Sequence, residues 1–354
     1  MKGTGQGIRE FIRICKCIPC GILWKDKGGH MGRTDRVLNK YFHDKRRFAD
    51  LFNGALFGGE QVIKAEELED KSETYTDDSS EEKSETNMQR SRDIAMRMRN
   101  GETLKLLAVE NQNQVDYAMP FRCMQYDVME YHQQLKELRK HNIEKGEFEN
   151  NAEWLCKIRK TDRIAPVYTL CVYYGEDSWD GPRCLKDMMD FGNDDDDMSG
   201  LFADYPMRLL CVNEKEDYSV FKTEVRHLFS AMRYRRDKKG LLQLINNNPD
   251  YRHVDMDTME AMSVMLDIPQ IWENRDKYID NEESEEGNMC QAIRELMEDA
   301  RNDGIEKGIE KGRQQGIEQG RLRMLIELVK QEIVSVKDAV NQSGMSEEEF
   351  KKLL

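Results

Sequence analysis

Apolar and polar residues alternate along two short runs that flank Asn100-Gly101, within the sequence RDIAMRMRNGETLKLLAVENQ of residues 92–112. Alternation with a period of two is the pattern of a half-buried β-strand. Asn-Gly between two such runs is a strong hairpin signal, because both central residues of a type I′ turn need positive φ. The pattern therefore predicts a β-hairpin in which residues whose numbers sum to 201 face each other.

The predicted hairpin gathers polar side chains on one face. Asp93 falls opposite Ala108, and strand alternation places these two residues on the same side as Glu110 and Gln112. Asp93 and Glu110 then form a diagonal pair with Cα atoms roughly 7–8 Å apart. Two such carboxylates can share one Mg²⁺ ion, which prefers oxygen ligands and keeps several waters. Acidic residues at strand ends are also commonly solvated, so spacing alone leaves both interpretations open.

Helical patterns lie on both sides of the hairpin. Apolar residues recur at helical spacing over Thr34–Phe52 and again over Tyr117–Leu138. In the second segment Arg122 and Tyr126 are four residues apart on one face, with Gln125 beside them. Two interpretations of this face remain open. In the first, Tyr126 is a core residue and Arg122 pairs with an acid. In the second, either Arg122 or Gln125 holds a phosphate group.

The rest of the first 275 residues predicts strands followed by helices. Arg163–Tyr174 and Arg208–Asn213 are rich in β-branched and apolar residues, as buried strands are. Helical segments follow around three further ranges, Thr223–Met232, Lys239–Asn246 and Met256–Leu266. The order hairpin, helix, strand, strand, helices predicts an α/β core with a mixed β-sheet flanked by helices.

Two acid-rich segments interrupt this core. Glu66–Asn87 is rich in serine, threonine and acidic residues and has too little apolar surface to order itself, so we expect a disordered insertion. The run Asp194–Asp197 lacks the glycine and distal glutamate of a calcium loop, and we expect a solvated loop.

The C-terminal part is a helical tail of a different kind. Glycine recurs every four residues from Gly304 to Gly320, and each internal glycine costs a helix about 1 kcal/mol relative to alanine. We expect a marginal helix that links or dimerises. Two short helices are predicted over Leu322–Val334 and Val336–Leu354, the second with a capping box made by Ser346 and Glu349. We therefore assign residues 31–275 to the core domain and residues 276–354 to a linker and tail through which the protein forms homo-oligomers.

The first thirty residues form a separate extension. Arg13 and Lys16 interrupt its apolar run, which makes it a poor signal peptide. Its three closely spaced cysteines are followed by no second Cys or His pair at zinc-finger spacing. Lys27–Met31 can be encoded by a bacterial ribosome-binding site followed by a start codon. We therefore expect residues 1–30 to reflect a start assigned too far upstream.

Charge and composition narrow the choice of environment and partner. The net charge of −14 is unusual for a DNA-binding protein, but residues 66–85 contribute −8 and residues 194–197 contribute −4. The basic cluster from Arg233 to Lys239 is typical of a solvated helix end. Nine scattered cysteines favour the reducing cytoplasm over a disulfide framework, and no apolar run approaches the ~20 residues that span a membrane.

Four segments resemble the Rpn family of recombination-promoting nucleases, also called YhgA-like transposases, and together they cover most of Met31 to about Arg321. They are GRTDRVLNKYFHDKRRFADLFNGALFGG (Gly32–Gly59), RDIAMRM, LLAVENQNQVDYAMPFRCMQYDVMEY (Leu106–Tyr131) and GIEKGIEKGRQQGIEQGR (Gly304–Arg321). The resemblance implies a PD-(D/E)XK nuclease fold and a DNA endonuclease that depends on Mg²⁺ or Mn²⁺.

The resemblance also implies roles for individual residues. Asp93 matches the motif aspartate and Glu110 the second acidic metal ligand, while Gln112 occupies the position of the lysine in the parent pattern. The missing positive charge makes activity less certain than fold, because such a charge helps to activate water or to stabilise the developing anion. Nucleases of this superfamily often carry an extra acid on a helix before the first strand, which makes Asp35 an accessory candidate. Asp50 is expected to be a cap or surface residue.

Two classes of function follow from these observations. The first is a Mg²⁺-dependent DNA endonuclease associated with recombination or mobile elements, in which Asp93, Glu110 and Gln112 are catalytic and Arg122 assists. The second is a catalytically inactive protein with a nuclease fold that binds nucleic acid or protein partners. Other enzyme classes lack support, because the sequence has no P-loop, no G-x-S-x-G motif and no H-E-x-x-H motif.

Overall fold

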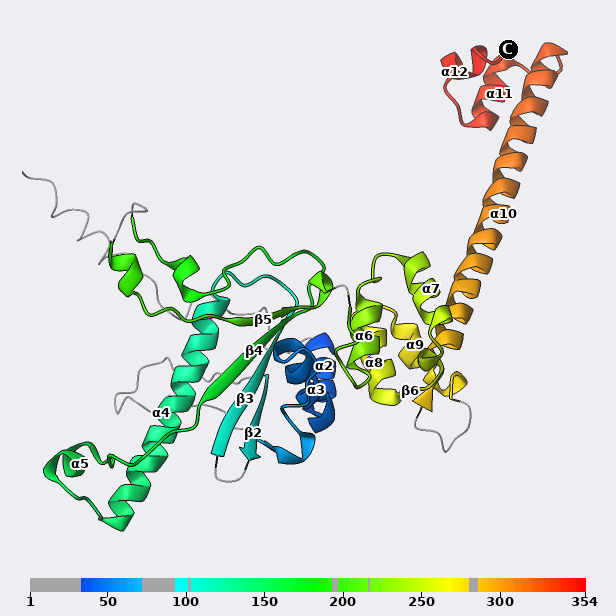
Figure 1. Ribbon diagram of the computed structural model, residues 1–354. Coiled ribbons are helices and arrows are strands. Elements are labelled where there is room, and N and C mark those ends of the chain that lie inside the picture. The colour runs from blue at the N-terminus through cyan, green and yellow to red at the C-terminus, as the bar shows by residue number, and fades with distance from the viewer. Residues whose placement is uncertain (1–32, 72–92, 101–102, 193–196, 216, 280–285) are drawn as a thin grey trace, which may run out of the picture. The chain divides into compact units, whose positions relative to one another are not determined.

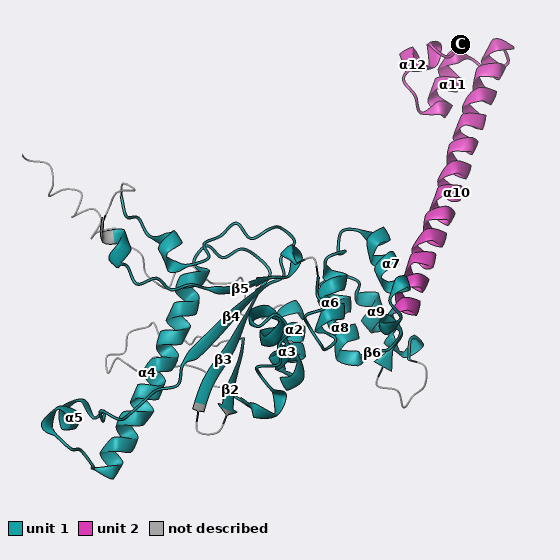
Figure 2. Cartoon of the chain, in the orientation of Figure 1, with its two compact units in different colours: residues 1–289 teal, residues 290–354 magenta. Residues whose placement is uncertain are grey.

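The computed structural model describes residues 33–71, 93–100, 103–192, 197–215, 217–279 and 286–354. The chain divides into two compact units, residues 1–289 and residues 290–354 (Figure 2). Three predicted features lie wholly or largely outside the described residues: the N-terminal extension, most of the acidic insertion and residues 194–196 of the aspartate run.

A five-stranded sheet lies in the first unit, in the order β1-β2-β3-β4-β5 (Figure 1). Its strands are β1 (Leu68–Asp70), β2 (Ile94–Asn100), β3 (Thr103–Gln112), β4 (Val167–Tyr173) and β5 (Arg208–Cys211). The first three pair antiparallel, whereas β3, β4 and β5 pair parallel. The predicted mixed sheet is confirmed.

The edge strand β1 corrects the predicted start of the acidic insertion. Leu68 is buried and pairs with Met98, and the backbone N–H of Lys71 continues the pairing by donating to Ala95 O at 3.0 Å. The prediction of disorder from Glu66 onward was therefore wrong for these residues. Pairing with β2 buries Leu68 in the core, which the acidic composition of the segment does not indicate.

The strands β4 and β5 are shorter than predicted. The run that was predicted from Arg163 begins as a strand only at Val167, directly after Pro166, which has no N–H to donate to a neighbouring strand. The second run ends as a strand at Cys211 and continues as a 3₁₀ turn over Val212–Glu214.

The helix α4 (Met119–Lys145) connects β3 to β4. A parallel strand pair requires such a crossover. Pro120 lies in its first turn, and Gly146 ends it with a left-handed φ of 68°. The prediction placed the end near Leu138, so the observed helix is longer. The short helix α5 (Asn151–Cys156) follows, capped by the Asn150 side chain.

Two helices precede the sheet, and the first of them packs on the face opposite α4. The predicted stretch from Thr34 to Phe52 is divided into α2 (Arg33–His43) and α3 (Lys45–Leu56) by Asp44, whose carboxylate accepts the N–H groups of Arg46 and Arg47. α2 contacts both β2 and β3, while α4 contacts β4 (Figure 1).

A group of helices completes the first unit. It comprises α6 (Val225–Met232), α7 (Lys238–Asn247), α8 (Met256–Met265) and α9 (Pro269–Glu273), and α8 packs on both α2 and α6. Phe229 of α6 contacts Phe42 and Phe221, with ring centroids 6.1 and 5.3 Å apart. The three predicted helices in this region are confirmed. The short strands β6 (Val254–Asp255) and β7 (Glu286–Gly287) form a second, two-stranded sheet.

The second unit is built on the long helix α10 (Met289–Lys330), followed by α11 (Val336–Ser343) and α12 (Glu347–Lys351). The glycine repeat lies inside α10, so the helix predicted to begin at Leu322 is the continuation of that helix. Leu325, Ala339 and Phe350 form a small buried core. The predicted capping box of Ser346 and Glu349 is confirmed.

Across both units, none of the described helices is long and apolar enough to cross a membrane.

Candidate active site

Asp93 lies immediately before β2, and its carboxylate is held from two sides. Asp93 Oδ2 accepts a hydrogen bond from the backbone N–H of Asn111 at 2.7 Å, and the side chain of Asn39 on α2 donates another. Burial raises the pKa of Asp93, these two bonds lower it, and the nearby charge of Asp35 raises it again, with a net increase. The negative charge is therefore costly at this position, and a bound cation would stabilise it.

The observed hairpin register differs from the predicted one. Ile94 pairs with Val109 and Asn100 pairs with Thr103, so the numbers of paired residues sum to 203. The predicted register at 201 was wrong, and Ala108 pairs with Ala95 instead of Asp93. The predicted turn residue Gly101 lies outside the described residues.

Packing across the strands explains the observed register. It places buried Ile94 opposite Val109 and buried Met96 opposite Leu107, whereas the predicted register would have placed Met96 opposite Lys105. Apolar cross-strand pairs stabilise the observed register, and the preference of Asn-Gly for a turn does not set the pairing. The displacement is an even number of residues, so every side chain keeps its predicted face. Extending the register makes Glu110 the direct neighbour of Asp93 across the hairpin instead of a diagonal one.

Glu110 is buried near the end of β3, on the face covered by α4. Its Oε2 lies 3.9 Å from Nη2 of Arg122, in the first turns of α4. Cys171 pairs with it in β4 and is also buried. Asn111, the next residue, points to the opposite face, where its Nδ2 donates to Asn39 Oδ1 at 2.8 Å. Alternation along β3 thus directs one carboxylate towards α4 and one amide towards α2.

Arg122 is held by carboxylates on the α4 side of the site. Its Nη1 donates to Asp116 Oδ2 at 2.6 Å, and it also interacts with buried Tyr126. Burial alone would lower the pKa of Arg122, but the Asp116 hydrogen bond and the charge of Glu110 raise it overall. The structure therefore shows the arginine–acid pair and the core tyrosine of the first interpretation.

Asp35 lies on the α2 side of the site, close enough to Asp93 to raise its pKa. The hydroxyl of Tyr174, directly after β4, donates to Asp35 Oδ1 at 2.9 Å. Burial and the charge of Asp35 both raise the pKa of Tyr174, which keeps the phenol protonated as a donor. Arg235 Nη1 in turn donates to the Tyr174 backbone oxygen at 3.4 Å. The site thus draws residues from α2, β3, α4 and the end of β4.

Comparison with known protein families gave a match. A family model described as "Putative transposase, YhgA-like" matches residues 34–263, which is well over half of the chain. The chain belongs to this family. The matched range extends from α2 into α8 and contains every site residue described above. A search of curated proteins and a search of solved structures gave no match.

In this YhgA-like protein the two predicted glutamines lie on different elements, Gln112 at the end of β3 and Gln125 on α4. The backbone oxygen of Gln112 accepts the N–H of Tyr174 at 2.9 Å, and its half-buried side chain makes no hydrogen bond to another described residue. Gln125 is half-buried on α4, one residue before Tyr126. The structure brings Asp35, Asp93, Glu110 and Arg122 into one region.

Four site residues escaped the sequence analysis: Asn39, Asn111, Asp116 and Tyr174. Asn39 follows Asp35 by four residues and so lies on the same helical face, which was an available signal. Tyr174 ends a predicted strand and meets α2 across 139 positions of sequence, which no local pattern reveals.

The donor set suits a hard cation that keeps part of its water shell. Within the described ranges there is no group of three or more His, Cys, Asp and Glu residues that could hold a metal ion. Asp93 and Glu110 offer two carboxylates, and Mg²⁺ needs only one or two of these beside a phosphate substrate. The buried Asn111 Oδ1 has no hydrogen-bond partner among the described residues. An orphaned buried oxygen of this kind favours a polar occupant on the α2 face, where the Asn111 side chain meets Asn39.

Proposed function

We propose that this YhgA-like protein is a Mg²⁺- or Mn²⁺-dependent DNA endonuclease that hydrolyses phosphodiester bonds in recombination or on mobile elements. The observation that carries the proposal is that Arg122 lies near both acids: it is 3.9 Å from buried Glu110, and its charge acts on Asp93. Asp93 itself directly precedes β2, and burial and the charge of Asp35 raise its pKa. A pair of acids in such a position is better stabilised by a cation than by solvent.

The residues divide the work in the proposed reaction. Asp93 and Glu110 hold the metal, which when bound lowers the pKa of a water and stabilises the leaving oxygen. Asn39 and the Asn111 N–H orient the Asp93 carboxylate through their hydrogen bonds. Arg122 orients Glu110 and presents positive charge towards the phosphate, while Gln112 positions the water or a phosphate oxygen. Gln125 and Asp35 are accessory residues in this scheme.

The family description supports DNA as the substrate, since transposases act on DNA. We place the reaction in the reducing cytoplasm, which suits the free cysteines found among the described residues. The acidic net charge of −14 opposes DNA binding in general. A metal ion between the acids and the phosphate would offset part of this repulsion at the site.

The tail provides the proposed route to homo-oligomers. Ile305, Ile309 and Ile317 are exposed on α10 next to the glycine repeat, and no atom lies within 4 Å of a Cβ built at any of the five repeat glycines. An open stripe of glycine beside exposed isoleucine allows the close approach of a second helix. Sedimentation velocity of the whole chain tests this, with a concentration-dependent dimer expected and a monomer at every concentration against it.

An alternative is a catalytically inactive member of the fold that binds nucleic acid or protein. One observation favours it: the neutral Gln112 stands in the lysine position, and Arg122 is already paired with Asp116. The site then lacks a free cation of its own to stabilise the transition state.

Plasmid cleavage in Mg²⁺ distinguishes the two. The variants are Asp93→Asn and Glu110→Gln, and the matched control is Glu69→Gln, which removes the same charge from an exposed position on β1. We expect cleavage by wild type and by the control, and loss of at least about 100-fold in each site variant. Equal cleavage by all four proteins excludes this metal site. No cleavage by wild type favours the inactive alternative.

A further inference from the structure

We infer that one exposed face of α4 binds the phosphate backbone of the DNA on which the candidate active site acts. This inference rests on the proposed function, and it assigns the path that the substrate takes away from the site.

The face is continuous along α4 and begins beside the site. Residues 121, 125, 128, 132, 136, 139 and 143 follow one another at steps of three or four, which places them on one side of a helix. Gln125 belongs to this series, and Arg122, which contacts Glu110, lies in the same helical turns. Phe121, Val128 and Ile143 are exposed along it. No other described element therefore covers this side of α4.

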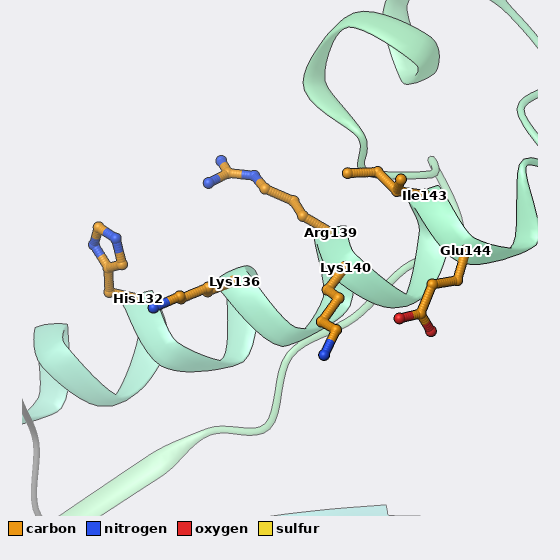
Figure 3. Close-up of a pocket in the computed structure, with 6 residues that line it drawn as sticks. All are labelled: His132, Lys136, Arg139, Lys140, Ile143 and Glu144. Atoms are coloured by element: carbon orange, nitrogen blue, oxygen red, sulfur yellow. The ribbon is translucent and has the colours of Figure 1, made fainter. Parts of the chain in front are cut away.

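The second half of the face is basic. His132, Lys136, Arg139 and Lys140 are all exposed, and none forms an ion pair with another described residue. They line a surface hollow of about 410 Å³ together with Ile143 and Glu144, and Lys136 reaches back along the helix towards His132 (Figure 3).

Some basic residues elsewhere in the first unit are already paired with protein carboxylates. Arg183 pairs with Glu214 at 3.2 Å, and Arg226 pairs with Asp250 at 2.8 Å. The charge of these side chains is already balanced by a protein carboxylate. The α4 cations instead remain available for an external anion, and phosphate groups take such unpaired Lys and Arg side chains as partners.

The length of the face indicates a polymer. Arg122 and Lys140 are separated by eighteen residues of one helix, which corresponds to about 27 Å at 1.5 Å per residue. This distance spans about 8 base pairs of duplex DNA at 3.4 Å each. A mononucleotide could occupy only a fraction of it, whereas a backbone with regularly spaced phosphates can meet Lys136, Arg139 and Lys140 together with His132.

A competing occupant is the acidic segment of this chain, since residues 66–85 hold ten acids against two lysines. DNA is favoured because the face runs without interruption to the site where the substrate phosphate would lie. The two occupants predict opposite effects of removing the basic residues. If DNA binds them, their removal weakens DNA binding. If the acidic segment covers them, their removal leaves the affinity for DNA unchanged or raises it.

The test is DNA binding by the full chain, measured by fluorescence anisotropy with a 20-base-pair duplex in EDTA, so that no cleavage contributes. The variant is Lys136→Ala/Arg139→Ala/Lys140→Ala, and the matched control, Lys238→Ala/Lys239→Ala/Arg252→Ala, removes three exposed cations from another part of the same unit. We expect the α4 variant to bind at least about tenfold more weakly. The slope of log Kd against log salt should fall by about 0.9 per cation removed. The control should keep the wild-type slope.

Several results would overturn the inference: wild-type affinity in the α4 variant, tighter binding than wild type, an equal loss in both triple variants, or no binding by wild type. Unchanged circular dichroism of the α4 variant ensures that a loss of binding is not a loss of fold. Binding that depends on α4 without any cleavage in Mg²⁺ would support this surface and contradict the endonuclease proposal, so the two ideas fail separately.

Discussion

Arg122 donates a 2.6 Å hydrogen bond to Asp116. This bond fixes the guanidinium on one side, so that its other nitrogen faces the buried carboxylate of Glu110 at 3.9 Å. The arginine is thus a positioning residue for a candidate metal ligand. Its place within the fold is set by a short-range contact between the β3–α4 loop and the second turn of α4.

Replacing Arg122 by glutamine should affect both activity and stability. The change leaves the buried carboxylates of Glu110 and Asp116 without their shared cation. Because the Arg122 side chain is itself partly exposed, we expect a loss of roughly 1–3 kcal/mol in the free energy of unfolding, less than for a fully buried pair. Cleavage should fall by about 10-fold or more. Urea denaturation and plasmid cleavage measure the two effects. Arg183→Gln, which breaks an exposed pair with Glu214, is the control and should cost under about 1 kcal/mol.

Restoring a lysine at Gln112 should increase activity. The side chain is half-buried beside the candidate site and makes no hydrogen bond that the substitution would break among the described residues. A cation there would stabilise the developing negative charge, and groups of this kind contribute about 10²-fold or more to such reactions. We expect Gln112→Lys to raise the cleavage rate at least severalfold. Gln114→Lys, which adds the same charge at an exposed position two residues on, should leave the rate unchanged.

Replacing Asp50 by asparagine should affect stability, whereas the same change at Asp35 should affect cleavage. The buried carboxylate of Asp50 accepts the N–H groups of Lys222 and Thr223 and the Thr223 hydroxyl, all within 2.9 Å, and so holds the chain before α6. Asp50 was expected to be a cap or a surface residue. It is not a surface residue, because its carboxylate is buried and holds this part of the backbone. Asp50→Asn should lower the free energy of unfolding by about 1–3 kcal/mol with little change in cleavage well below the melting temperature.

Asp35→Asn should act on the site instead. It keeps a partner for the Tyr174 hydroxyl but removes the charge that raises the pKa of Asp93. We expect a small effect on thermal stability and a clear change in the Mg²⁺ concentration that gives half-maximal cleavage. The reverse pattern for these two aspartates would contradict their assignments.

The stability of the protein should depend on pH through His227. Burial and the adjacent Arg226 lower the pKa of His227 below its ordinary 6.5. The unfolded chain therefore binds this proton at a higher pH than the folded chain does, and stability is lost as the pH falls below about 6.5. His227→Gln should flatten the dependence of the unfolding free energy on pH in that window. An unchanged slope would show that other groups control it.

Much of the fold follows from local patterns. The buried run that ends at Tyr173, the helices α6 and α8 and the capping box of Ser346 all carry their signals within a few residues. The hairpin was predicted on the correct face but in the wrong register, because Asn100-Gly101 is a local signal whereas the contact of Met96 with Leu107 is not.

The candidate site was harder to predict in full. Asp93 and Glu110 could be paired from strand alternation, and the observed register, extended by one pair, sets them directly opposite each other. The contacts of Asn39 with Asp93 and of Tyr174 with Asp35 join α2 to the sheet, and they depend on how distant elements pack. No spacing rule reaches across such a separation, so these supporting residues become visible only in three dimensions.

The most direct test of the account is a Mn²⁺ titration followed by electron paramagnetic resonance, in which the signal of free Mn²⁺ reports binding. We propose that Asp93 and Glu110 together hold a divalent cation. This proposal predicts binding to wild type and to Glu69→Gln, weakened at least about 10-fold in both Asp93→Asn and Glu110→Gln. Equal binding by all four proteins, or no binding by wild type, would contradict it.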